Sequence, residues 1–88
     1  MKTIYKYPIL LEEKQIISMP INAEILTVQI QNNVPCLWAL VDNKLPLSDV
    51  TVIVYSTGAE IDQSQNLKYC STLQVFDGAM VFHVFINQ

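Results

Sequence analysis

Apolar and polar residues alternate with a period of two along most of the chain. This alternation is typical of β-strands that bury one face, and no long segment shows the wider spacing of an amphipathic helix. We therefore predict strands over residues 3–7, 14–19, 23–31, 34–41, 50–57, 67–76 and 79–87. Strands separated by short turns are typical of an all-β fold, here a small antiparallel sandwich or barrel-like domain of six to seven strands. With 88 residues and no internal repeat, we expect a single all-β domain over residues 1–88.

Two turn signals predict how four of these strands pair. Asn32-Asn33 lies between the third and fourth strands, and Asp77-Gly78 comes directly before the last one. Asn and Gly tolerate the left-handed backbone of tight turns, so each signal predicts an antiparallel hairpin. Alternation along the third strand assigns Leu26 and Val28 to one face and Ile25 to the other.

The run CLWALV, residues 36–41, is apolar on both faces of its strand. Segments 50–55 and 80–86 are two-sided in the same way, although a domain of this size has one interior. We expect Trp38 in that interior, and a homodimer in which a second copy of the chain covers the surplus apolar face. The alternative is a monomer whose N-terminal segment packs across that face. The surplus is drawn from the sets Leu37/Ala39/Val41, Ile53/Tyr55 and Val81/His83/Phe85.

Composition and the N-terminal residues predict the cellular compartment of the protein. Hydrophobic residues make up 51% of the chain and charged residues 15%, which is too apolar for a disordered protein. No apolar run reaches the roughly 18 residues of a membrane helix. No apolar segment of the signal-peptide kind precedes Glu12. We therefore predict a cytoplasmic protein with no membrane partner, in which Cys36 and Cys70 are buried, reduced thiols.

The charge balance argues against nucleic acid as a partner. The chain has five lysines, no arginine and a formal net charge of −3. Nucleic acids are bound by basic surfaces rich in both residues, so extended nucleic acid is disfavoured, and we predict no such partner. The two glycines stand apart and cannot form a phosphate-binding loop.

The residues suited to catalysis are few. His83 is the one histidine, and its context VFHVF favours a partly buried structural residue over a catalytic base. Together with Cys36 and Cys70 it lacks the paired spacing of metal ligands. We predict that the protein is not an enzyme and has no catalytic residue, metal site or cofactor.

The segment 57–66, TGAEIDQSQN, is the longest polar stretch and is predicted to be a loop. Polar loops on rigid β scaffolds are frequent binding sites. The candidate binding residues come from this loop and the adjoining aromatic strands, with a tryptophan added as an alternative surface anchor: Trp38, Tyr55, Thr57, Gly58, Glu60, His83 and Phe85.

An ordered set of short motifs resembles a known family. These motifs are KYP at 6–8, MP at 19–20, PCLWALVD at 35–42, TG at 57–58 and VFHVF at 81–85. The set is similar to a family of small domains of unknown function found largely in bacteriophage and prophage genomes. The resemblance covers nearly the whole chain, and it implies a phage-related origin without supplying an activity.

The resemblance and the composition together suggest three functions, ranked by analogy with small phage proteins. The first is a binding protein that occupies a host protein, such as an antiviral-defence component, in the host cytoplasm. The second is an oligomeric sink for a nucleotide-type signalling ligand, for which Lys44 or Lys68 would supply the positive charge. The third is an accessory protein of virion assembly. The acidic balance disfavours the second, because phosphate groups are bound best by arginine.

Overall fold

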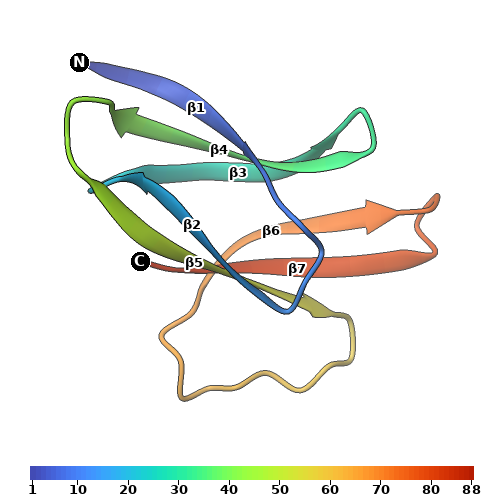
Figure 1. Cartoon of the computed structure of the whole chain (residues 1–88). Helices are drawn as coiled ribbons and strands as arrows, with labels where there is room; N and C mark the ends of the chain where they lie inside the picture. The colour runs from blue at the N-terminus through green and yellow to red at the C-terminus, as the bar shows by residue number, and fades with distance from the viewer.

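The computed structural model describes residues 1–88 and contains seven β-strands and no helix (Figure 1). It therefore holds no helical segment with the length and apolar character needed to cross a membrane. The prediction of an all-β fold is confirmed. The strands are β1 (Lys2–Pro8), β2 (Lys14–Pro20), β3 (Glu24–Gln31), β4 (Val34–Asp42), β5 (Leu47–Ser56), β6 (Lys68–Val75) and β7 (Met80–Asn87).

The strands form two antiparallel sheets that face each other. One sheet has the order β1-β4-β3 and the other the order β2-β5-β7-β6. On one side of the molecule β3 and β6 meet, where the backbone N–H of Val28 donates a hydrogen bond to Oγ of Ser71 at 2.8 Å. The opposite side, between β1 and β2, has no such junction. The arrangement is thus a sandwich closed along one side.

Both predicted hairpins are present. β3 and β4 pair through a turn in which Asn32 and Asn33 have positive φ angles of 51° and 66°. β6 and β7 are joined by residues 76–79, because Val75 is the partner of Met80. This second loop is longer than the Asp77-Gly78 signal alone implies, and Phe76 belongs to the loop instead of the strand.

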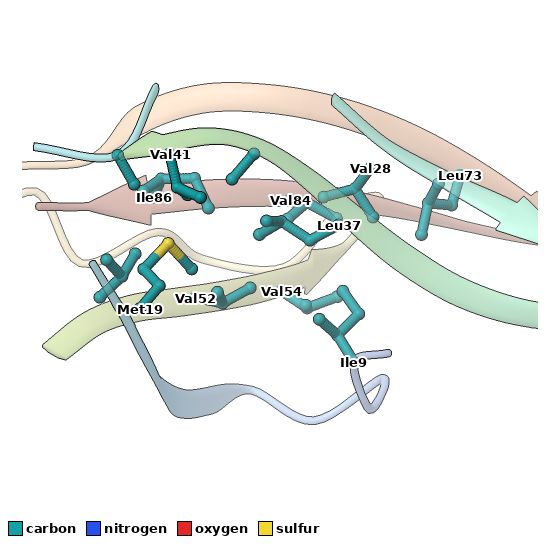
Figure 2. Close-up of a cluster of buried hydrophobic side chains, with 13 residues drawn as sticks. Ile9, Met19, Val28, Leu37, Val41, Val52, Val54, Leu73, Val84 and Ile86 are labelled. Carbon is teal, nitrogen blue, oxygen red and sulfur yellow. The ribbon is translucent and has the colours of Figure 1, made fainter. Parts of the chain in front are cut away.

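The core lies between the sheets and is built from small aliphatic side chains of both (Figure 2). Leu37, Ala39 and Val41 of β4 point into it and are almost fully buried. These three residues were predicted to belong to a surplus face, and that prediction is wrong: their face is the interior. The other members of the core are Ile9, Met19, Ala23, Val28, Val50, Val52, Val54, Leu73, Val84 and Ile86.

The opposite face of β4 is the outer surface of the three-stranded sheet. Trp38 lies there, beside Lys6 of β1 and Thr27 of β3, and is only partly buried. The prediction that Trp38 is a core residue is therefore wrong. A hydrogen bond from Nζ of Lys6 to Oε1 of Gln31, 3.0 Å long, joins β1 to β3 across β4. β1 itself pairs with β4 as a strand of the sheet and does not pack across its face.

Two edge strands contain irregularities where they approach each other. The register of β3 shifts between Ile25 and Thr27, and that of β6 shifts between Tyr69 and Ser71. In β3 the extra residue is Leu26, which is 42% exposed. Ile25 instead packs against the core together with Val28, so the predicted face assignment of these residues holds only beyond the bulge.

A long connection explains how the second face of β5 is covered. β5 and β6 run in the same direction with β7 between them, so the chain must return along the sheet over residues 57–67. It does so on the side away from the three-stranded sheet (Figure 1). Ile53 and Tyr55 point to this side, yet they are only 1% and 8% exposed. Their burial therefore does not require a second copy of the chain.

β1 and β2 are the free edges of the two sheets, and their sequences, KTIYKYP and KQIISMP, are alike. Ladder hydrogen bonds involve alternate residues, and the N–H of Ile9 and the carbonyl of Glu13 both bond inward. The residues whose backbone groups point outward are therefore the even-numbered ones, which include a lysine at the start and a proline at the end of each strand. Lysine and proline at such positions discourage pairing with other chains.

Candidate functional site

The structure divides the predicted binding residues between two surfaces. Trp38 lies alone on the outer face of the three-stranded sheet. Tyr55, His83 and Phe85 lie together on the outer face of the four-stranded sheet, where Tyr55 is the register partner of His83. Thr57 follows β5 directly and is tied to the same place, because its N–H donates to the carbonyl of Val81 at 3.2 Å. We call this second group the histidine cluster.

His83 is held by hydroxyl groups on both of its ring nitrogens. Oγ1 of Thr57 lies 2.8 Å from Nε2, and Oγ1 of Thr72 lies 3.1 Å from Nδ1. The hydroxyl of Tyr69 continues the chain of hydrogen bonds, 2.7 Å from Thr72. A neutral imidazole needs one donor and one acceptor, and rotating hydroxyls match either tautomer. The ring is thus fixed in orientation while remaining partly exposed.

Aromatic rings extend the histidine cluster along β7. The ring of Phe85 contacts Tyr55 and Tyr69 in edge-to-face geometry, with centroids 6.0 Å and 5.9 Å away. Tyr55 is buried beneath the 57–67 connection, whereas Tyr69 is 56% exposed. The outward side of the cluster therefore combines a tyrosine ring with the imidazole and threonine hydroxyls, groups that stack and form hydrogen bonds.

The connection that carries Gly58 and Glu60 is ordered by its own hydrogen bonds. The Oγ and N–H of Ser64 donate to the carboxylate of Asp62 at 2.6 and 2.9 Å, and they hold the pKa of Asp62 below its ordinary value. The N–H of Asp62 lies 3.4 Å from the hydroxyl of Tyr55, which joins the connection to the cluster. Gly58 has φ +90° and open space around it, so it turns the chain away from the sheet.

The groups bonded to His83 are hydroxyls, and those around them are aromatic rings. No carboxylate is bonded to His83, and no group of three or more His, Cys, Asp or Glu side chains could hold a metal ion. Both cysteines are free; Cys36 is buried, as predicted, whereas Cys70 is only partly buried. They belong to β4 and β6, strands of different sheets.

A residue outside the predicted set has the most unusual environment. Phe76 has φ 53°, a left-handed conformation that is rare for an aromatic residue, and its side chain is 77% exposed. It forms the tip of the β6–β7 hairpin with Asp77 and Gly78, which also have positive φ. The sequence signal was present, because an aromatic residue stands directly before the Asp-Gly turn, but period-two alternation assigned it to the strand.

The β6–β7 hairpin lies at the end of the molecule opposite the chain termini (Figure 1). Three surface hollows lie around this end. The largest, about 620 Å³, is lined by Leu11, Ile30, Pro35 and the hairpin segment 74–78. The second is lined in part by Tyr55 and Glu60, and the third by Thr57 and Met80. We call this region the hairpin end. It includes several of the predicted binding residues.

The protein is a small all-β sandwich with an aliphatic core between its two sheets. Its distinctive exposed groups lie on the β6–β7 loop and on the outer face of the four-stranded sheet. The model of the family described as "Domain of unknown function (DUF7352)" matches residues 1–88, so the chain belongs to this family. The resemblance to a family of unknown function is thereby confirmed. No curated protein and no solved structure matches the chain.

Proposed function

We propose that this protein is a non-enzymatic binding protein that docks onto a partner protein through its hairpin end. Phe76 is the observation that carries the proposal. Its backbone conformation is strained for an aromatic residue, and its exposed ring is unfavourably hydrated, so both features cost free energy in the unbound protein. An apolar pocket of a partner would remove the second cost.

The surroundings of Phe76 suit an anchor residue. Leu11 and Met80 are 37% and 44% exposed and line the neighbouring hollows. Aromatic anchors that fill a partner's pocket, ringed by weaker contacts, supply most of the binding energy in many interfaces. The hairpin end offers this combination of one protruding ring and several shallow apolar contacts.

Charge indicates the kind of partner surface. The acidic residues Glu13, Glu60 and Asp77 line two of the three hollows, and no lysine lines any of them. A partner with an apolar pocket and a basic rim would complement this surface. The resemblance to phage and prophage domains supports a host protein, such as a component of antiviral defence, as that partner. In this proposal the protein acts in the host cytoplasm.

Crosslinking from the hairpin tip tests the proposal. A photoreactive phenylalanine analogue placed at position 76 is expected to capture one host protein from a bacterial lysate. The same analogue at Leu47, which is 68% exposed and lies at the start of β5, is the matched control. Equal capture from both positions would contradict docking through the hairpin end.

Phe76→Asn then measures the contribution of the ring. Asparagine tolerates positive φ, so this variant should melt at the same or a higher temperature than the wild type. Its affinity for the captured partner is expected to fall by about 2 kcal/mol, roughly thirtyfold, as measured by calorimetry. Leu47→Asn should leave affinity unchanged. A Phe76→Asn protein that binds normally would remove the main support for the proposal.

A further inference from the structure

The side of the sandwich where β3 meets β6 contains an opening with a structural cause. The bulge at Leu26 in β3 and the bulge at Cys70 in β6 line the same pocket, which has a volume of about 320 Å³. A bulge leaves its extra residue without a ladder partner and bends the strand. Two bulges on facing edges therefore separate β3 from β6 at this point. Phe76 lies beyond the other end of β6.

Hydrogen bonds define the borders of this bulge pocket. On one border Oγ of Ser71, directly after Cys70, accepts the N–H of Val28 at 2.8 Å and holds the two sheets together. On the other, Nε2 of Gln88 donates to the carbonyl of Ala23 at 2.6 Å. The sheets are thus fixed on both sides of the opening, so the pocket is part of the folded framework.

The lining of the bulge pocket combines an apolar floor with two opposite charges. Ile25, Leu26 and Ile86 supply aliphatic surface. Glu24 and Lys68 also line it. They form no ion pair with each other, because the one salt bridge in the protein joins the N-terminus to Asp42. Two unpaired opposite charges beside an apolar floor match a ligand of complementary charge pattern.

We propose that the bulge pocket binds a small zwitterion with an apolar side chain, that is, a free apolar α-amino acid. The ammonium group of the ligand pairs with Glu24 and its carboxylate with Lys68. The apolar side chain rests against Ile25, Leu26 and Ile86. The pocket volume lies at the small end of the range for ligand sites, about 300 Å³ upward, which suits a single amino acid.

Titration with L-leucine and two single-charge analogues tests this proposal. L-leucine is expected to bind in calorimetry, whereas isoamylamine and 4-methylpentanoate, which each keep one charge, should bind about tenfold more weakly. L-leucine should also slow alkylation of Cys70 by iodoacetamide, because this thiol lines the pocket while Cys36 is buried. Failure of L-leucine to bind, or equal binding of either analogue, would overturn the proposal.

Charge-removing variants locate the site. Glu24→Gln and Lys68→Gln alter exposed side chains, so both proteins should fold normally. Each is expected to weaken L-leucine binding about tenfold. Glu60→Gln and Lys44→Gln remove the same charges outside the pocket and should have no effect. Equal losses in the control variants would show that the amino acid binds elsewhere. The proposal does not depend on the partner protein, since neither Glu24 nor Lys68 lines the hollows of the hairpin end.

Discussion

Leu37→Ala is expected to lower the free energy of unfolding by about 2–5 kcal/mol. Leu37 is fully buried between the sheets, where it lies near Val28 and Val84 (Figure 2). The substitution removes apolar contacts and leaves a cavity that the surrounding strands cannot fully close. Small domains have a total stability of only about 5–15 kcal/mol, so the loss should appear clearly in urea denaturation.

Leu40→Ala is the matched control, because it removes the same atoms from the opposite face of the same strand. Leu40 is only partly buried on the outer surface, beside Ile4 and Glu24. Its replacement should therefore cost much less than that of Leu37. Equal losses at both positions would mean that the outer face of β4 is also buried, as it would be if a second copy covered it.

Ser71→Ala is expected to destabilise the protein by about 1–3 kcal/mol. Ser71 is 8% exposed, and its Oγ is the acceptor for the N–H of Val28, a residue that is itself 1% exposed. Without the hydroxyl, this buried N–H has no acceptor, and its uncompensated desolvation lowers the free energy of unfolding. The loss is large for a single hydroxyl because this buried bond joins the two sheets.

Ser18→Ala on the free edge strand β2 provides the comparison. Ser18 is exposed and makes no side-chain hydrogen bond, so its replacement should change stability by less than about 0.5 kcal/mol. Urea denaturation of the two variants separates the general effect of losing a hydroxyl from the effect of losing the hydrogen bond between Ser71 and Val28. A Ser71→Ala protein as stable as Ser18→Ala would show that the sheets are held together without this bond.

Much of the fold follows from local sequence signals. Period-two alternation located all seven strands, and the asparagine pair at 32–33 fixed the first hairpin. The orientation of two-sided strands was beyond reach, because both faces of CLWALV are equally apolar. Only the partner sheet decides that Leu37 points inward and Trp38 outward. The bulge at Leu26 was missed for a related reason, since Ile25 and Leu26 are adjacent apolar residues that fit either register.

The candidate surfaces were less accessible to sequence analysis. His83 and Phe85 could be placed together because alternation assigns residues two apart on one strand to the same face. Tyr55 belongs to β5, and no local signal revealed that β5 pairs with β7. Thr72 and Tyr69, which complete the hydrogen bonds of His83, lie on β6. The Asp77-Gly78 signal predicted that β6 pairs with β7, but not the register of that pair, which the longer loop and the bulge at Cys70 set. Phe76 was not among the predicted binding residues, because what sets it apart is its positive φ angle. Phenylalanine rarely adopts positive φ, so the residue type gives no sign of this conformation.

The alternation of backbone groups along the free edges should be visible in amide hydrogen exchange. In β1 and β2 the amides of Ile4, Lys6, Ile16 and Ser18 point to solvent, whereas those of the residues between them are bonded into the sheets. Amides without a ladder partner exchange without any opening of the structure. Neighbouring amides should therefore exchange at alternately fast and slow rates, as resolved by NMR. The fast positions are the backbone groups through which another strand could extend either sheet. Uniformly slow exchange there would mean that another chain has paired with the edge.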